Sequence, residues 1–320
     1  QQEKKSIGKE IEIIKNEKRV SKDVSIDIFY EYYLYIESKC KKNNYNLLLH
    51  RHLGDSLVLI ALREQFENKY GKPLHYLIQK EQEVIARMYG VTNYTVIDLK
   101  KLVHGIDLSN LNRVEKDAVE ENLCERIFTS IPQMDYPFIA APTFLIQEEC
   151  GWKNFVDGWA KMIGISAEKV AVPQYFPTYT EDGQTKIEKL GCKMEDIILL
   201  APEAQTFTGI PKRFWQELIE RKVSEGKKIV LNTIYEDKEF TGVNNLHLCI
   251  NDLIALGYQC GEVYSLRSGL CDCLSAKGDK LHVYYTPDMN FNYFSINNCF
   301  ISSNENVREQ IINALEVEHE

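Results

Sequence analysis

Two short segments, one in each half of the chain, constrain the fold more than any other feature of the sequence. Residues 47–57 read LLLHRHLGDSL and residues 264–270 read YSLRSGL, and each predicts an apolar strand running into a glycine turn that opens a helix. In α/β proteins such turns hold ligands, because free backbone N–H groups and the helix dipole point into the crevice there. Two of them predict two nucleotide-binding-type domains that face a shared cleft.

The composition limits the class of protein. The 320 residues suffice for two domains with their own cores, and a net charge of −9 disfavours general nucleic-acid binding. No apolar run reaches the roughly 20 residues of a membrane span, and the N-terminus lacks a signal-peptide core. The nine cysteines lack paired CxxC spacing, so we expect buried thiols, no metal site and a cytoplasmic protein. The basic segment 39–42 is either a peripheral contact with the inner face of the membrane or a solvated loop.

Hydrophobic periodicity divides the chain into an α/β protein of four parts. We expect an N-terminal helical extension over residues 1–44, a Rossmann-like domain over 45–175, a second over 185–303, and a C-terminal helix over 304–320. A polar, proline-rich linker is expected over 172–184. The strands are expected at 46–50, 74–79, 94–98, 137–142, 196–202, 227–233, 262–266 and 280–287. The helices are expected at 56–70, 81–88, 112–128, 154–165, 211–226 and 251–259. This alternation predicts doubly wound parallel sheets.

The first turn offers a candidate catalytic group. Gly54 permits a close backbone approach, and Asp55 lies at the start of the helix. Asp55 either caps this helix or points into the cleft, where a carboxylate can take a proton from a sugar hydroxyl as a general base. His50 and His52 alternate along the end of the strand, so we expect one of them to reach the cleft. We assign Asp55 to catalysis and His50, His52 and Gly54 to the acceptor side.

The second turn offers a candidate anion site. The backbone N–H groups of Ser268, Gly269 and Leu270 would hold a pyrophosphate at a helix N-terminus, and the Arg267 guanidinium would add charge-assisted hydrogen bonds. The alternative is a capped helix in which Arg267 forms a salt bridge with a neighbour.

Lys212 and Arg213 form a third group. Two cations at a helix N-terminus oppose the helix dipole, which is favourable where an anion binds and otherwise marks a solvated helix start. The Asp-x-Asp pair that bridges a metal to a nucleotide diphosphate is absent, as are a Walker A loop and a GxGxxG motif. We therefore expect a metal-independent diphosphate site.

These motifs resemble those of the two-domain GT-B glycosyltransferases, and among them family 9, the ADP-heptose–lipopolysaccharide heptosyltransferase type. A Gly-Asp turn follows the first strand of that family, here Gly54 and Asp55, and an LRE-F phrase follows, here residues 62–66. A strand and PGA begin its second domain, here residues 202–204, and a K-x-W phrase opens the next helix, here residues 212–215.

The family motif D-[ST]-G-x-x-H falls on Arg267, Ser268, Gly269 and Asp272. Arg267 replaces an acid and Asp272 replaces a histidine, which leaves the donor open. The Arg-Ser-Gly turn also resembles that of fucosyl-type transferases that use GDP-sugars. An acidic residue after the next strand binds the nucleoside in family 9, and Glu236 or Asp237 occupies that region here.

The resemblance implies an inverting transfer of a sugar from a nucleotide-diphosphate sugar, with no further cofactor, to a glycan, lipid-linked or protein acceptor. Asp55 is then the base, and the expected donor contacts are Lys212, Arg213, Glu236, Arg267, Ser268, Gly269, Leu270 and Asp272. The sugar, nucleotide, acceptor and oligomeric state stay open. Two other functions also stay open. One is a nucleotide-sugar epimerase of the same architecture. The other is a non-catalytic partner in a polysaccharide-synthesis complex, with the aromatic-rich residues 29–35 as its interface.

Overall fold

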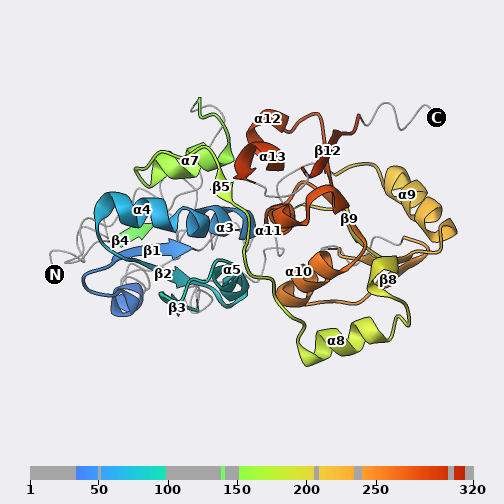
Figure 1. Cartoon of the computed structure of the whole chain (residues 1–320), viewed down its shortest axis with the longest axis horizontal. Helices are drawn as coiled ribbons and strands as arrows, with labels where there is room; N and C mark the ends of the chain where they lie inside the picture. Colours follow the sequence, from blue (N-terminus) through green and yellow to red (C-terminus); the bar gives the residue numbers. More distant parts are fainter. Residues whose placement is uncertain are drawn as a thin grey trace, which may run out of the picture.

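Two α/β halves lie side by side, and helices α3 and α11 meet between them (Figure 1). The computed structural model describes residues 34–49, 52–98, 138–140, 151–204, 209–233, 240–301 and 306–313, with backbone only at 138–140. The predictions for the extension before residue 34, for the helix at 112–128 and for His50, Glu236 and Asp237 lie outside these residues.

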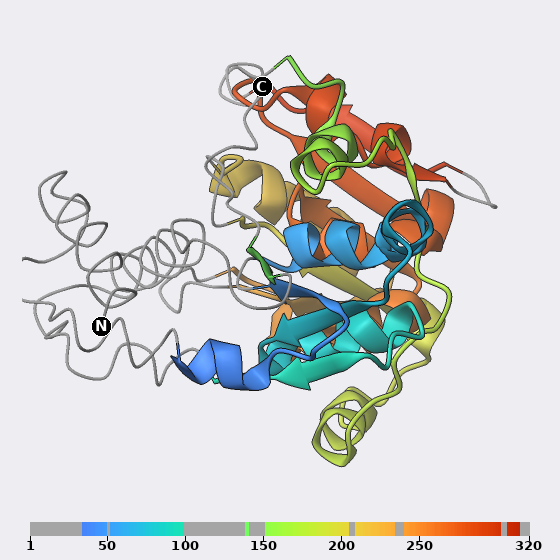
Figure 2. The ribbon, with the colours of Figure 1, turned by 90° about the vertical axis from the view of Figure 1, so that its left-hand side faces the viewer.

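The first half is a four-stranded parallel sheet in the order β3-β2-β1-β4. Its strands are β1 Tyr45–Leu49, β2 Leu74–Ile78, β3 Tyr94–Val96 and β4 Phe138–Ala140. Its helices are α3 Leu53–Ala61, α4 Arg63–Tyr70, η1 Lys80–Gln82, α5 Glu83–Met88 and α7 Phe155–Met162. β1 and β2 are almost fully buried, as expected for strands of a parallel sheet that is covered on both faces. Figure 2 views this half from its outer side, in front of the second.

The second half is a six-stranded parallel sheet in the order β12-β10-β9-β6-β7-β8. Its strands are β6 Ile197–Ala201, β7 Lys228–Leu231, β8 Val243–Asn245, β9 Glu262–Leu266, β10 Leu281–Tyr285 and β12 Arg308–Ile311. Its helices are α8 Glu181–Glu188, η5 Met194–Asp196, α9 Lys212–Ser224, α10 Ile250–Gln259, α11 Gly269–Cys273, η6 Ser275–Lys280, α12 Phe291–Phe294 and α13 Ile296–Cys299.

Both sheets reverse their winding beside their first strand. Strands β1, β2 and β3 follow one another toward one side of the sheet, and β4 then lies on the other side of β1. It likewise lays down β6, β7 and β8 and then places β9 on the other side of β6. Open parallel sheets bind ligands outside the carboxyl ends of the strands at such a reversal. The predicted turns follow β1 and β9, so each lies at the reversal of its own sheet.

Two further contacts join the halves. β5 Val170–Ala171 pairs in parallel with β11 Phe300–Ile301. The ring of Phe155 on α7 lies 6.4 Å from that of Tyr293 and 5.8 Å from that of Phe294, measured between centroids. The chain therefore packs α12 and β11 against the first half before it returns to the second sheet at β12.

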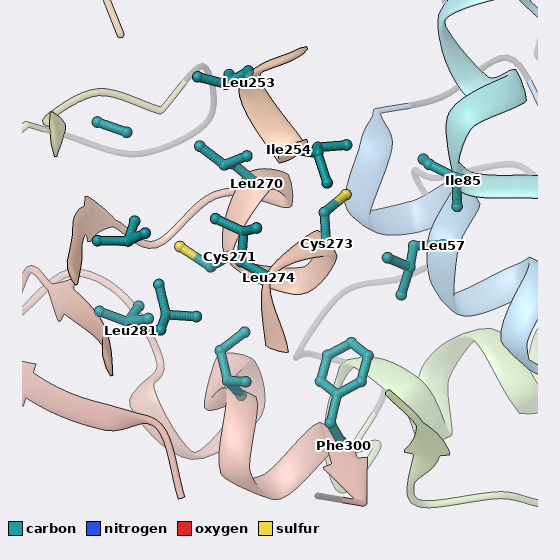
Figure 3. Packing of buried hydrophobic residues seen from close by; sticks show 14 of the residues in the cluster. Leu57, Ile85, Leu253, Ile254, Leu270, Cys271, Cys273, Leu274, Leu281 and Phe300 are labelled. Atoms are coloured by element: carbon teal, nitrogen blue, oxygen red, sulfur yellow. The ribbon is translucent and has the colours of Figure 1, made fainter. Parts of the chain in front are cut away.

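Figure 3 shows apolar side chains of both halves in a single cluster. Leu57 on α3 and Ile85 on α5 belong to the first half, and Ile254 on α10 and Cys273 on α11 belong to the second. All four are fully buried. Removing apolar surface from water is the main favourable contribution to packing, so this shared core holds the halves against one another.

Two predictions about elements are wrong. The C-terminal helix expected from residue 304 is absent from the described residues 306–313, where β12 extends the sheet in parallel beside β10. Its residues favour helix by propensity, but pairing with an open sheet edge overrides that preference. The linker is also shorter than predicted, because α8 begins inside it, where the Thr180 hydroxyl caps the helix by accepting from the Gly183 N–H.

The helix predicted at 56–70 is two helices, α3 and α4, that meet at Leu62. Within the described residues, no helix combines the length and the apolar character needed to cross a bilayer.

A buried polar network crosses the first sheet. Asn46 accepts from the Lys41 N–H through its side-chain oxygen, which also lies 2.8 Å from Nδ1 of His75. His75 therefore donates through Nδ1, and its Nε2 accepts from the Thr95 hydroxyl at 2.9 Å. Burial, aided by the nearby charge of Lys41, lowers the pKa of His75 from 6.5 to about 4. The folded protein thus holds this histidine neutral at any pH above that value.

We expect the free energy of unfolding to fall as the pH drops from about 6.5 to about 4. In that window the unfolded chain binds a proton at His75 and the folded chain does not, which costs up to about 1.4 kcal/mol per pH unit. Urea unfolding of His75→Gln should show a shallower loss than the wild type between pH 7 and pH 5. Equal slopes in the two proteins would contradict the assignment.

Candidate functional site

The two glycine turns are in direct contact across the halves. A Cβ atom on Gly269 would lie only 2.7 Å from the backbone nitrogen of Gly54, and one on Gly54 would overlap the carboxylate of Asp272. Real Cβ atoms do not approach other atoms so closely, so only glycine permits this contact. The α3 and α11 N-termini therefore close the expected cleft at this point.

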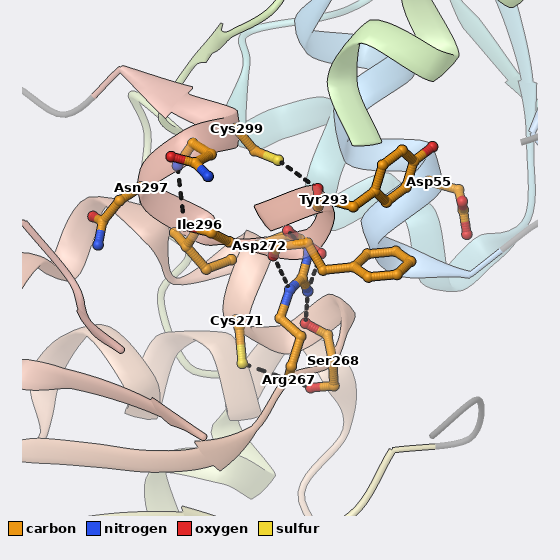
Figure 4. A network of polar contacts seen from close by, with 12 residues as sticks. Asp55, Arg267, Ser268, Cys271, Asp272, Tyr293, Ile296, Asn297 and Cys299 are labelled. Carbon is orange, nitrogen blue, oxygen red and sulfur yellow. Dashed lines mark hydrogen bonds and ion pairs between the residues drawn. The ribbon is translucent and has the colours of Figure 1, made fainter. Parts of the chain in front are cut away.

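Arg267 and Asp272 form a buried ion pair beneath this contact (Figure 4). Nη1 of Arg267 lies 2.9 Å from Oδ2 of Asp272, and Nη2 lies 2.8 Å from Oδ1, a bidentate arrangement. Nη1 also donates to the Ser268 carbonyl, and Nε donates to the Phe294 carbonyl. Arg267 is 3% exposed and Asp272 1% exposed. The guanidinium thus fastens the turn after β9 to α12.

Arg267 and Asp272, two of the predicted donor contacts, bind one another and are almost fully shielded from solvent. Neither side chain faces a ligand in this conformation, and their role in donor binding stays a prediction. The alternative expected from the sequence, a salt bridge between Arg267 and a neighbour, is the one found. Burial lowers the pKa of the Arg267 guanidinium, but the Asp272 charge outweighs burial and raises this pKa above its ordinary value.

The N–H groups of the second turn belong to a short helix. Ser268 is the N-cap of α11, without a side-chain capping bond, and its carbonyl accepts from the Cys271 N–H. Leu270 is buried, and Gly269 faces Gly54. Ser268 and Gly269 are only partly exposed, and a further atom on Gly269 would meet the backbone of Gly54.

Asp55 lies in the first turn of α3, three residues after the N-cap. The N-cap is His52, which is exposed and makes no side-chain capping bond. The Asp55 carboxylate is partly exposed and accepts a hydrogen bond from Nε1 of Trp159 on α7 at 3.2 Å. Figure 4 places Asp55 on the other half from the Arg267–Asp272 pair, in the same region of the molecule. Trp159 is fully buried, so a rigid donor fixes one oxygen of the carboxylate.

Lys212 and Arg213 open α9, as predicted, but they differ in their contacts. The Lys212 ammonium lies 5.5 Å from the centroid of the Phe240 ring. Arg213 forms an exposed i,i+4 pair with Glu217, of the kind that contributes little. Of the two, Arg213 is the residue already engaged by a carboxylate.

A pocket of about 240 Å³ lies at the carboxyl ends of β7 and β8. Its apolar wall comes from β7, from the loop after β8 and from Leu253 on α10, and its polar lining is Asn232, Thr233, Asn245 and His247. Small-molecule sites commonly combine apolar walls with a few placed polar groups. His247 has φ +47°, and residues held in such sparsely populated conformations cluster at functional sites.

Two contacts of the candidate site were not predicted from the sequence, one on each half. Glu203, at the end of β6, is 8% exposed and accepts from the Thr233 hydroxyl at 2.9 Å. Trp159 contacts Asp55 across 104 residues of sequence. Glu203 replaces the glycine of the PGA motif, so the sequence could have indicated a carboxylate at this position. No local pattern could have indicated the Trp159 contact.

The fold can be compared with solved structures. No protein-family model and no curated protein matches the sequence. The glycosyl transferase family 9 protein of Veillonella parvula superposes with a TM-score of 0.54 at 13% identity, over 86% of this chain and 88% of that one. ADP-heptose lps heptosyltransferase II of E. coli superposes with a TM-score of 0.52 at 13% identity, over 83% and 92%. This chain has the GT-B fold. The predicted architecture and the predicted resemblance to family 9 are confirmed at the level of fold.

Replacing Arg267 by Met should lower the free energy of unfolding by about 3–5 kcal/mol, because it leaves the Asp272 carboxylate buried without its partner. Chemical denaturation measures the change. Arg308→Met is the matched control, since Arg308 pairs with Asp279 at 2.9 Å on the surface and should cost less than about 1 kcal/mol. Similar losses for the two variants would contradict the structural role of the buried pair.

Proposed function

We propose that this protein is a glycosyltransferase that moves a sugar from a nucleotide-diphosphate sugar to an acceptor hydroxyl without a metal ion. The observation that carries the proposal is the position of Asp55. It is a partly exposed carboxylate at the winding reversal of the first sheet of a GT-B fold, and it accepts a hydrogen bond from Trp159. The two solved structures compared above carry glycosyltransferase or heptosyltransferase names, which supports the same reaction class.

The reaction is a single in-line displacement at the anomeric carbon. The acceptor oxygen forms a bond to that carbon, its proton passes to the Asp55 carboxylate, and the bond from carbon to the diphosphate oxygen breaks. The leaving group is the nucleoside diphosphate. Because the displacement is single and in line, the anomeric configuration inverts. Trp159 keeps the carboxylate oriented for the transfer, as a general base requires.

The donor belongs on the second half. The pocket beside β7 and β8 is the proposed site for the nucleoside, and Lys212 is the proposed cation for the diphosphate. Positive charge at the leaving group stabilises the transition state of such a displacement. Because Gly54 lies against Gly269, a diphosphate that reaches the residue 268–270 N–H groups requires the two turns to separate first.

The proposed acceptor is a glycan, a lipid-linked sugar or a protein side chain. A lipid-linked acceptor would place the protein at the inner face of the membrane. The aromatic-rich segment that would favour a non-catalytic partner, residues 29–35, lies largely outside the described residues. Of its two described residues, Leu34 is exposed, and Tyr35 packs on its own chain, where its hydroxyl accepts from the Asp98 N–H. No described contact favours the epimerase over the transferase.

Asp55→Asn should lower transfer by about 10²–10⁴-fold, the usual contribution of a positioned general base. Asn keeps an oxygen that can accept from Trp159, so folding and donor binding should be unchanged. The assay incubates UDP-, GDP- and ADP-sugars with glycan and lipid-linked acceptor fractions and follows acceptor-dependent release of nucleoside diphosphate.

Glu64→Gln, which changes an exposed carboxylate on α4, is the control and should retain full activity. Unchanged turnover in Asp55→Asn would contradict the role of Asp55. Conversion of the sugar nucleotide without any acceptor would favour the epimerase.

A further inference from the structure

Helix α7 contacts both halves and carries a side chain that binds Asp55. Trp159, in the middle of this helix, is fully buried and donates its indole N–H to Oδ1 of Asp55 at 3.2 Å. The helix has only eight residues. Because isolated helices shorter than about 12–15 residues are marginal in water, the position of α7 depends on its tertiary contacts.

The start of α7 is bound to the second half through Asn154. The side-chain oxygen of Asn154 caps the helix by accepting from the Asp157 N–H at 2.9 Å. Its amide group donates to the Glu168 carbonyl at 2.8 Å and to the carbonyl of Asn298, on α13, at 3.1 Å. The side chain is almost fully buried. One of its three hydrogen bonds therefore joins α7 directly to the second half.

An aromatic contact lies beside this bond. The Phe155 ring is 6.4 Å from the Tyr293 ring and 5.8 Å from the Phe294 ring, both on α12, within the range of favourable aromatic pairs. Phe155 and Trp159 are four residues apart, so they are neighbours on the surface of the helix. The contact with α12 is thus one turn away from the indole that binds Asp55.

The other end of α7 is bound within the first half. The hydroxyl of Tyr70, on α4, donates to the carbonyl of Gly164, just beyond the helix, at 3.1 Å. Trp159 lies between this attachment and the contacts of Asn154 and Phe155. The two ends of α7 therefore answer to different halves of the molecule.

Helix α12 is itself fastened to the turn after β9. The Phe294 carbonyl accepts from Nε of Arg267 at 2.8 Å and from the Tyr285 hydroxyl at 3.3 Å. Arg267 belongs to that turn, and Tyr285 ends β10. A continuous series of contacts therefore leads from the second sheet through α12 to α7, and from α7 to Asp55.

We propose that Asn154 and Phe155 are positioning residues for Asp55, through which the second half controls the orientation of the proposed base. The inference rests on the proposed function, because it takes Asp55 as that base. While α7 is in contact with α12 and α13, its indole N–H is held against the carboxylate. Once these contacts are lost, only the first half holds α7, its start shifts relative to α3, and the bond between Trp159 and Asp55 weakens.

The test observes the Trp159 indole directly, by nuclear magnetic resonance of the full chain with ¹⁵N-labelled tryptophan. The chain has three tryptophans, so Trp159→Phe identifies the Trp159 signal by its loss. Asp55→Ala then gives the position of this signal without the bond.

Three variants weaken the contacts with α12 and α13. Asn154→Ser keeps a capping oxygen but removes the amide that reaches α13, whereas Phe155→Leu and Phe294→Leu each remove one ring of the aromatic contact. Each variant should move the Trp159 signal by about half of the distance to its position in Asp55→Ala. Phe294→Leu is the most direct of the three, because the altered side chain belongs to the second half.

Asn93→Ser is the matched control. The Asn93 amide also donates two hydrogen bonds, to the Leu74 carbonyl at 2.9 Å and to Oδ1 of Asn44 at 3.0 Å, and neither partner is on α7. The Trp159 signal should keep its wild-type position in this variant. A signal unmoved in those of the three variants that fold would overturn the inference, since a purely structural role lowers stability without moving the signal.

The transferase assay separates this inference from the proposed function. With an active sugar nucleotide, Phe294→Leu should lower kcat about twofold to tenfold, the effect of one hydrogen bond, at unchanged KM for the donor. The same substitution should have no further effect in a Trp159→Phe background. An equal loss in both backgrounds would overturn the coupling and leave the transferase standing. A wild type that transfers no sugar would overturn the proposed function, whereas the Trp159 signal still shows whether α12 positions Asp55.

Discussion

The contact between Gly54 and Gly269 is the constraint on which the arrangement of the two halves depends. Each glycine begins a helix after a strand, and each lies where its sheet reverses its winding. Because neither residue has a side chain, the α3 and α11 N-termini meet backbone to backbone. The Asp272 carboxylate lies against Gly54 and is neutralised by Arg267 from below. A charge that could have faced a ligand is thereby used to hold the interface together.

Parallel winding explains why the candidate groups lie along one edge of each sheet. All strands of each described sheet point the same way, so the loops after β1, β6, β7 and β9 emerge on ligand-binding edges. Asp55 comes from one sheet, while Glu203, Thr233 and the pocket come from the other. In the proposed reaction the base and the donor site lie on separate halves, which suits two substrates that each bind to their own half. In the same proposal, a diphosphate that binds at the turn after β9 requires the two glycine turns to separate.

The sequence was sufficient for the architecture and for the two glycine turns, and insufficient for the contacts that these turns make. Apolar runs followed by glycine turns predicted β1 with α3 and β9 with α11, because strand and turn signals are local. Whether Arg267 binds a ligand or forms an ion pair depends on whether Asp272, five residues later, faces it inside the closed interface. Hydrophobic periodicity does not show this. The C-terminal segment was predicted as a helix because helix propensity is a local property of the sequence. Its pairing with the open edge of β10, which makes it a strand, depends on residues far away in the sequence. The bond from Trp159 to Asp55 likewise exists only once the two elements are packed.

The central claim is that the nucleotide binds along the carboxyl edge of the second sheet and that its entry separates the two glycine turns. A crystal structure with a bound nucleoside diphosphate tests this most directly. The account predicts a base in the pocket beside Thr233, a diphosphate toward Lys212 and the turn after β9, and a longer distance between Gly54 and Gly269. A nucleotide found on the first half, or one bound on the second half with Gly54 and Gly269 still in contact and the pocket empty, would contradict it.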